Sequence, residues 1–316
     1  MTLQDLPLEI LDTILRLVGS GSLRKHEACC LLMSKWWYGL AEPILLEDLT
    51  LHADQLSCIP AKALVRLGRS VRRLEIDLTP ASDRQVDEEF NVNLNEVLSR
   101  LLPRFVQLRT FTLLARGYFN PKTPMAPYTD YLGQEFSMKF LEILPFSLLS
   151  DLTIDTSGSE ITAREHLCPQ IAAKIPSLRS LRLRMRCICP RVLEFDHNSK
   201  IESIIVNLSL KESYLLNAGF SHHCTEPKSA YDLNDAMVTA ATNTAASLPS
   251  VKMLRILCHK HPYLDMVTTD CINGSQMVLS DDREWDWSDD GPLCVHDEEP
   301  SDRDLFDSDS EDDHIL

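Results

Sequence analysis

The sequence predicts an α/β protein in which short parallel strands alternate with helices. A small helical unit precedes this body, and a disordered acidic tail follows it. Three observations lead to the prediction: an apolar stripe of helical period near the start, a six-residue apolar frame that recurs seven times, and an excess of acidic residues after residue 280. The expected boundaries are 1–47 for the helical unit, 48–287 for the alternating body with a terminal hairpin, and 288–316 for the tail.

The first residues form an amphipathic pattern. Leu6, Ile10 and Ile14 recur every four residues, with further apolar residues beside them, which predicts a helix of about twelve residues. Pro7 suits the first helical position because its missing N–H has no partner there in any case. Residues 19–22, Gly-Ser-Gly-Ser, are expected to break this helix. A second apolar stretch follows, and Ser34 is expected to cap a third helix that starts at residue 35.

Three motifs in this region resemble the F-box family. They are Leu6-Pro-x-Glu9-Ile10, Met33-Ser34-Lys35-x-Trp37 and Ala41-x-Pro43-Ile44-Leu45. In that family a three-helix module docks on a small Skp-family adaptor, which sits on a cullin scaffold carrying a RING subunit. The resemblance implies a packed and adaptor-facing surface made of Leu6, Pro7, Ile10, Ile14, Leu15, Met33 and Trp37. The alternative is an ordinary helical hairpin that covers the first repeat of a larger domain.

One frame, apolar-x-x-apolar-x-apolar, recurs along the body. Its seven copies begin at Leu46, Val71, Leu108, Leu149, Leu178, Ile201 and Val251. The last residues of each copy alternate as a half-buried strand does, and helical stretches lie between the copies. Examples of these stretches are residues 86–102, 134–144, 163–175 and 230–247.

The recurring frame resembles an irregular leucine-rich-repeat solenoid, in which each turn supplies one strand to a curved parallel sheet and one helix to the outside. Successive anchors lie 23 to 50 residues apart, which is wider and less even than in regular repeats. A doubly wound α/β domain is the alternative, but no glycine-rich phosphate turn follows any frame. Asn273-Gly274, between two β-like runs, predicts a closing hairpin.

If the sheet is solenoidal, the residues interleaved with the anchors point to its concave face. Acidic residues of the early strands then face basic residues of the later strands, which suits recognition of a protein segment. The candidates for substrate contact are Glu75, Asp77, Arg182, Arg184 and Arg255. The alternative for each residue is an ordinary solvated strand position.

The tail carries most of the charge. Residues 281–316 hold sixteen acidic residues against two arginines, a local charge of −14 out of −16, so residues 1–280 are nearly neutral. Such a segment buries too little apolar surface to fold. Ser308 and Ser310 each have an acidic residue three positions on, which resembles an acidophilic kinase site. A solvating tail is the simpler interpretation; a sharper hypothesis has it fold back on Arg182, Arg184 and Arg186.

Several kinds of chemistry find no support in the sequence. A near-neutral body argues against nucleic-acid binding, and no apolar stretch reaches the length of a membrane span. Cys258-His259-x-His261 with Cys271 fits no common zinc spacing, so neither a metal nor another cofactor is expected. No nucleophile elbow or glycine loop indicates a catalytic residue. We expect a soluble protein of the cytoplasm or nucleus with reduced cysteines.

The function that these resemblances imply is substrate recognition within an SCF-type cullin-RING ubiquitin ligase. The helical unit would bind the Skp-family adaptor, and the repeats would hold an unidentified protein substrate for ubiquitin-dependent degradation. Irregular repeats of this kind are most similar to those of fungal F-box proteins. Two alternatives stay open: a repeat scaffold outside any ligase, and an α/β enzyme with an unrecognised site.

Overall fold

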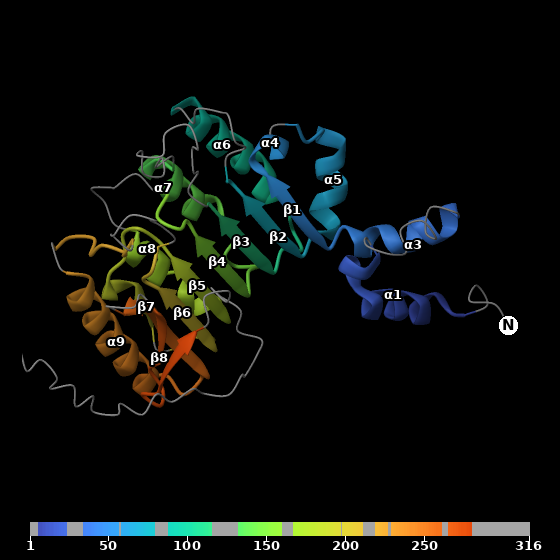
Figure 1. Ribbon diagram of the computed structural model, residues 1–316. Helices are drawn as coiled ribbons and strands as arrows, with labels where there is room; N and C mark the ends of the chain where they lie inside the picture. Colours follow the sequence, from blue (N-terminus) through green and yellow to red (C-terminus); the bar gives the residue numbers. More distant parts are fainter. Residues whose placement is uncertain are drawn as a thin grey trace, which may run out of the picture.

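A computed structural model describes residues 6–23, 34–56, 58–79, 88–115, 132–159, 167–196, 198–210, 219–226, 229–260 and 265–279. Within these ranges the protein is a mixed α/β structure built on one nine-stranded sheet (Figure 1). The strands follow one another in sequence order across the sheet. They are β1 (Asp48–His52), β2 (Arg73–Asp77), β3 (Thr110–Leu114), β4 (Asp151–Asp155), β5 (Ser180–Arg184), β6 (Ser203–Asn207), β7 (Met253–Lys260), β8 (Asp265–Asp270) and β9 (Gln276–Leu279).

Strands β1 to β7 are parallel and coincide with the seven predicted frames. Their register aligns the fourth residue of every frame, so that Leu49 pairs with Leu74 and Leu74 with Phe111, and so on to Leu254. The sixth residues align in the same way. Because side chains alternate along a strand, both rows point to the same face of the sheet. This face is the buried one.

The strands also begin with a repeated backbone hydrogen bond. In each parallel pair, the carbonyl of the second residue of one frame accepts two N–H groups at the start of the next strand. Arg72 and Arg73 donate to Glu47 in this way, and the same bond recurs at each of the six parallel junctions, with N···O distances of 2.6 to 3.1 Å. The chain therefore enters each of the strands β2 to β7 with the same pair of backbone hydrogen bonds.

Helices cover the face that carries the apolar rows (Figure 1). The helices that pack on the body are α4 (Ala53–Leu56), α5 (Ala61–Ser70), α6 (Glu88–Leu101), α7 (Gln134–Ile143), α8 (Cys168–Ala172) and α9 (Ala230–Ser247), with short 3-10 turns η3 (Leu102–Arg104), η4 (Ile175–Ser177) and η5 (Pro190–Leu193). Residues such as Leu98 of α6, Phe140 of α7 and Met237 of α9 pack with the strand anchors in one continuous core. Burial of this apolar surface is the main force that holds helices and sheet together.

Several predicted helix bounds agree with the structure, and one differs. Helix α9 covers residues 230–247 as expected, and it starts at a capping box in which Ser229 and Asp232 bond each other's backbone N–H groups. Helix α7 agrees to within one residue. Of the helix expected over 163–175, the described part from residue 167 contains only the short α8, and the chain passes into η4 at residue 175.

The predicted closing hairpin is confirmed. Strand β8 runs antiparallel to β7, and β9 runs antiparallel to β8. Gly274 adopts φ of +75°, a conformation that glycine reaches without strain, and the side chain of Asn273 accepts the N–H of Ser275 at 2.8 Å. The change of direction ends the parallel sheet.

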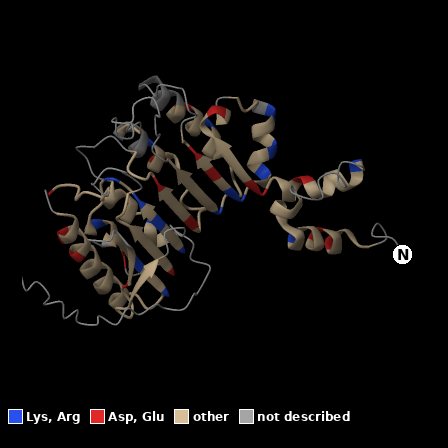
Figure 2. Ribbon diagram, in the orientation of Figure 1, with Lys and Arg blue, Asp and Glu red and all other residues tan. Residues whose placement is uncertain are grey.

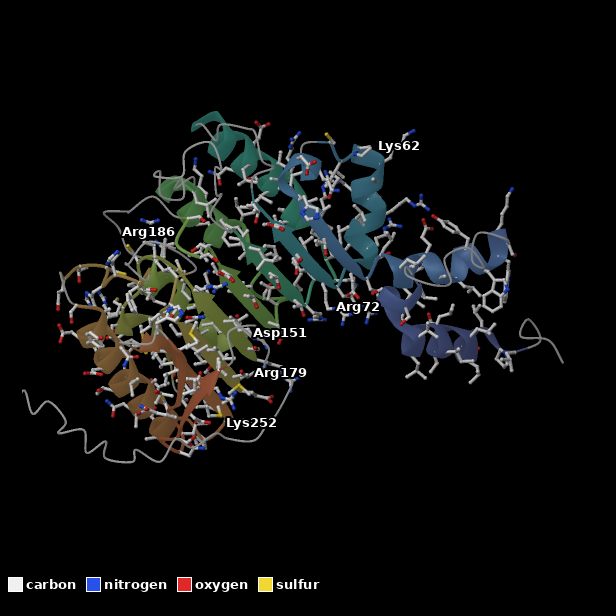
Figure 3. The ribbon with its side chains drawn as sticks, viewed as in Figure 1. Lys62, Arg72, Asp151, Arg179, Arg186 and Lys252 are labelled. Atoms are coloured by element: carbon white, nitrogen blue, oxygen red, sulfur yellow. The ribbon has the colours of Figure 1, made fainter. Side chains whose placement is uncertain are left out.

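Charged residues gather along the edge where the strands begin. Figure 3 shows Arg72, Asp151, Arg179 and Lys252 in a row along this edge. Glu202 accepts hydrogen bonds from Lys252 and Arg179, each at 2.7 Å. These two bonds hold the pKa of the Glu202 carboxyl at about 2, well below its usual value. The cluster joins β5, β6 and β7 at the surface.

The Glu202 cluster predicts a dependence of stability on pH. A carboxyl whose pKa is lowered in the folded state stabilises the protein above its ordinary pKa, and this stabilisation is lost as the pH falls toward the folded pKa of about 2. We expect Glu202→Gln to lower Tm at neutral pH, and the difference from wild type to shrink at acidic pH and at high salt. Glu142→Gln, on the exposed side of α7, is the control. An equal Tm difference at pH 7 and pH 3 would contradict the assignment.

Helix α5 approaches η3 closely at Gly68. A Cβ atom at this position would lie 2.4 Å from the carbonyl oxygen of Arg104, whereas at Gly39 it would meet no atom within 4 Å. Val106 also donates its N–H to the Gly68 carbonyl at 3.2 Å. Only a residue without a side chain allows this contact.

We therefore expect Gly68→Ala to destabilise the protein by about 1–3 kcal/mol, because the two backbones must separate. Gly39→Ala is the matched control, since it also lies inside a helix but in open space. It should be neutral or stabilise by up to about 1 kcal/mol, as alanine favours the helix. Urea unfolding of both variants measures the difference. Equal stabilities would refute the close approach.

Candidate functional site

The helical unit lies at one end of the sheet, beyond β1 (Figure 1). It contains α1 (Leu8–Ser22) and α3 (Lys35–Leu45). The predicted break is confirmed at Gly19, whose φ is +77° inside the span of α1. The predicted cap is confirmed too, because the Ser34 hydroxyl accepts the N–H of Trp36 at 3.3 Å. Of the second predicted apolar stretch, Leu23 to Met33, residues 24–33 lie outside the described residues.

The inner side of this unit holds a small core of its own. Leu15, Leu23, Ala41 and Ile44 pack together and are not part of the cluster between the sheet and its helices. These four are the buried members of this core among the described residues, and a helical unit of about 45 residues buries little apolar surface by itself. The unit therefore depends on its attachment to the sheet or on a partner.

The outer side of α1 is apolar and exposed. Ile10 is 48% exposed, Ile14 39% and Leu17 83%. Their spacing of four and then three residues places them on one side of the helix. We call these three residues the α1 apolar face. Leu8 and Val18 are exposed beside it, and α3 adds the exposed rings of Trp36 and Tyr38. A concentration of exposed apolar side chains on one small unit is typical of an interaction surface.

The structure distributes the predicted adaptor-binding residues over both sides of the unit. Ile10 and Ile14 are exposed, as is Pro7. Leu15 is buried in the small core, so it positions the helix and does not contribute to its outer surface. Leu6 and Trp37 are half-buried. Met33 lies outside the described residues. The exposed Leu17 was missed, although its helical spacing from Ile14 is visible in the sequence.

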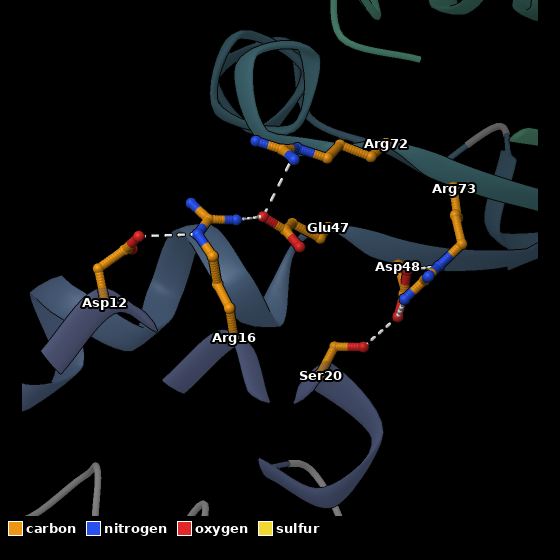
Figure 4. Close-up of polar contacts among 7 residues, drawn as sticks. All are labelled: Asp12, Arg16, Ser20, Glu47, Asp48, Arg72 and Arg73. Atoms are coloured by element: carbon orange, nitrogen blue, oxygen red, sulfur yellow. Dashed lines mark hydrogen bonds and ion pairs between the residues drawn. The ribbon is translucent and has the colours of Figure 1, made fainter. Parts of the chain in front are cut away.

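Ion pairs fix the helical unit to the sheet (Figure 4). Arg16 of α1 bonds Asp12 at 2.8 Å and also pairs with Glu47, which lies 3.6 Å from the Arg72 guanidinium. The hydrogen bond to Asp12 is the main cause that raises the pKa of Arg16. Glu47 thus joins α1 to β2 through its side chain.

A second set of contacts runs through the first residue of β1 (Figure 4). The Asp48 carboxylate accepts the Ser20 hydroxyl of α1 and pairs with Arg73 of β2, whose Nη2 lies 2.5 Å away. In addition, Arg66 of α5 pairs with Glu42 of α3. No linker separates the units, since α3 ends at Leu45 and β1 begins at Asp48. The orientation of the α1 apolar face is therefore set by the body.

The residues interleaved with the anchors lie on the opposite face of the sheet, because side chains alternate along a strand. Figure 2 marks the charged residues along the strands. In register the interleaved residues include Thr50, Glu75, Thr112, Thr153 and Arg182. Thr50 is exposed and the other four are half-buried. Farther along the sheet the face is covered, because Ile205 of β6 and Leu257 of β7 are fully buried. The accessible part therefore centres on β1 to β5.

Of the predicted substrate residues, Glu75, Asp77 and Arg182 lie half-buried on this accessible part. Asp77 is 3.6 Å from the His52 imidazole. Arg255 is half-buried and its Nε lies 3.9 Å from an Asp270 oxygen on β8. On this part the acidic Glu75 and Asp77 belong to β2, and the basic Arg182 belongs to β5.

Arg184 differs from the expectation because it is buried. Its side chain is 2% exposed and forms a bidentate pair with Asp155, with N···O distances of 2.7 and 2.5 Å. Asp155 also accepts the backbone N–H and the hydroxyl of Ser157, each at 3.0 Å. The arginine therefore stabilises the carboxyl ends of β4 and β5 and does not present its charge to a ligand.

The burial of the Asp155–Arg184 pair predicts how removing one or both partners changes the free energy of unfolding. Asp155→Ala leaves the Arg184 guanidinium buried without its partner, which should cost about 3–5 kcal/mol of the free energy of unfolding. Replacing both residues by apolar ones, Asp155→Leu with Arg184→Met, should cost much less because no charge stays buried. Urea unfolding compares the variants. A single variant as stable as wild type would mean that the pair is open to solvent.

Three cysteines form a cluster that sequence reasoning missed. The sulfur atoms of Cys168, Cys189 and Cys224 all lie within 4.8 Å of one another, and those of Cys168 and Cys224 are 3.6 Å apart. Cys168 and Cys189 are buried and Cys224 is half-buried. Hydrogen bonding to Cys189 is the main cause that raises the pKa of the Cys168 thiol to about 12. Cys258 and Cys271, whose spacing fits no common zinc pattern, are not part of this cluster.

A pocket of about 430 Å³ lies among α4, α5 and α6. Its lining is apolar apart from Ser99, Arg100 and Arg104. Among the described residues that line it there is no carboxylate, imidazole or thiol. The predicted phosphorylation sites Ser308 and Ser310, and the whole tail from residue 288, lie outside the described residues.

Comparison of the sequence with models of known protein families gives no match, and no curated protein matches it at a significant level. In the part of the chain that the structure describes, no helix is both long enough and apolar enough to cross a membrane.

Proposed function

We propose that this chain is the substrate-recognition subunit of an SCF-type cullin-RING ubiquitin ligase. In this proposal the helical unit is an F-box that binds the Skp-family adaptor, and the body is an irregular leucine-rich-repeat solenoid that holds a protein substrate. The chain itself catalyses no reaction. The observation that carries the proposal is the exposed α1 apolar face on a small helical unit.

Exposure and energy favour a protein partner for the α1 apolar face. Burying an isoleucine or leucine side chain contributes roughly 1.5–3 kcal/mol, so three such residues leave a large gain unused in the isolated chain. An adaptor surface that covers Ile10, Ile14 and Leu17 would recover it. The sequence resemblance to the F-box, in the motifs around Pro7, Ser34 and Pro43, names the adaptor as this partner.

The body supports the other half of the proposal. Seven strands in sequence order, one recurring frame and the same backbone bond at each parallel junction are what a repeat architecture requires. Helices occupy one face of the sheet, and on the other face β1 to β5 keep an accessible strip with Glu75, Asp77 and Arg182. Opposite charges at separate places on one surface orient a bound protein segment.

The adaptor contact is tested with two exposed residues of the α1 apolar face. We expect Ile14→Glu with Leu17→Glu to weaken binding of the purified Skp-family adaptor by about tenfold or more, since each charge would be buried against an apolar surface. Val65→Glu is the matched control, because Val65 is also an exposed apolar residue of a helix but lies on α5. It should bind as wild type does.

Calorimetric titration with the adaptor measures these affinities, and unfolding curves establish that each variant is folded. A wild-type protein that does not bind the adaptor would overturn the ligase proposal and favour a repeat scaffold. Equal affinities of wild type and the double variant would place the adaptor contact elsewhere on the molecule.

A further inference from the structure

The cysteine cluster brings together three segments that are distant in sequence. Cys168 is the first residue of α8, Cys189 precedes η5, and Cys224 lies in the segment after β6. The backbone pairs Cys187 with His222 in a parallel bridge, and the N–H of Ile188 donates to the His222 carbonyl at 3.0 Å. Cys189 and Cys224 each follow this bridge by two residues, so their side chains lie on the same side of the paired segments.

Cys168 completes the cluster from the helix side. Its sulfur accepts the backbone N–H of Cys189 at 3.3 Å. A backbone N–H that points at a sulfur stabilises the thiolate form, and such bonds surround metal-bound thiolates in proteins. The three sulfurs therefore lie together at a site where two of the three residues are buried and a backbone N–H donates to one sulfur.

The spacing of the sulfurs suits a small thiophilic cation. Zinc binds thiolates at about 2.3 Å, so the sulfurs of a tetrahedral site lie about 3.8 Å apart. The sulfurs of Cys168 and Cys224 are 3.6 Å apart, and no pair of the three is farther apart than 4.8 Å, so the separations are compatible with this value. Without a cation, ionisation of one thiol opposes ionisation of its neighbours, and a dication removes that repulsion.

We propose that Cys168, Cys189 and Cys224 bind one zinc ion as thiolates. Binding displaces the three thiol protons to solvent, and no electron is transferred. The ion would tie the start of α8 to the segment before η5 and to the segment after β6. This inference is independent of the proposed function, since it concerns only the stability of the body.

The fourth position of the ion falls to Cys187 or to water. Cys187 is half-buried and lies two residues before Cys189. His223 does not suit this role, because its Nδ1 already accepts the N–H groups of Thr225 and Glu226, at 3.4 and 3.1 Å. An imidazole that accepts at Nδ1 carries its proton on Nε2 and has no lone pair left for a metal.

Two other interpretations predict different results. The 3.6 Å separation of Cys168 and Cys224 would also suit a disulfide, which would leave Cys189 without a role. Alternatively, the three residues are small core side chains that meet by packing. Neither binds metal with defined stoichiometry.

The test uses the full chain, purified without a histidine tag in a reductant that does not chelate metals. We expect native mass spectrometry to show one zinc per chain. Cobalt titration should give the charge-transfer and d–d bands of tetrahedral thiolate coordination, saturating at one equivalent. Zinc should raise Tm and a chelator should lower it, because the ion binds the folded state.

Cys189→Ser and Cys224→Ser should each weaken cobalt and zinc binding by at least about tenfold and abolish the zinc-dependent rise in Tm. Cys58→Ser, at an exposed position, and Cys271→Ser, at a buried position outside the cluster, are the matched controls and should bind as wild type does. Cys187→Ala changes the cobalt spectrum if Cys187 is the fourth ligand and leaves it unchanged if water is.

Three results would overturn the proposal. The first is a folded wild-type chain, shown by circular dichroism, that binds no stoichiometric zinc. The second is unchanged binding in folded Cys224→Ser. The third is a Cys168–Cys224 disulfide, detected by peptide mapping, in protein that binds no zinc after reduction.

Discussion

The structure depends on one constraint, the register of the seven parallel strands. Each strand contributes two apolar residues to the same buried face, and a slip of one residue would turn both toward the opposite face. At each parallel junction, the carbonyl of the second residue of one frame accepts two N–H groups at the start of the next strand. This repeated bond sets the register. Leu49 and Leu254, at the two ends of the parallel part, thereby belong to one row.

The attachment of the helical unit derives from the same register. Glu47 is the second residue of the first frame, so its carbonyl accepts the N–H groups of Arg72 and Arg73. Its carboxylate meets Arg16 and Arg72. One residue thus serves the sheet through its backbone and the helical unit through its side chain. The α1 apolar face keeps its orientation only while β1 and β2 are paired.

The regular parts of the fold could be predicted from the sequence because their signals are local. The frames predicted all seven parallel strands, the helical stretch expected over 230–247 is α9, and Asn273-Gly274 predicted the hairpin. Of the candidate site, Ile10 and Ile14 were predicted and are exposed, whereas Leu15 packs inside. Which side of a helix faces a core depends on how the unit is mounted.

The contacts that were missed join residues far apart in the chain. Arg184 and Asp155 are 29 residues apart, and Cys168 and Cys224 are 56 apart. Nothing in a local pattern distinguishes an arginine that is exposed on a strand from one that pairs with the neighbouring strand. Cys189 and Cys224 belong to segments joined by the bridge between Cys187 and His222, and Cys168 approaches them from α8. The strand register brings such residues together only when the segments that connect the strands have also folded.

The absence of a linker between α3 and β1 has a consequence for any two molecules that the protein binds at once. When binding surfaces are joined by a flexible segment, the effective concentration of one ligand near the other falls with the length of that segment. Here Glu47 and Asp48 clamp the junction through Arg16, Arg72 and Arg73. A ligand on the helical unit and a ligand on the sheet would therefore meet at a separation set by the shape of the folded chain.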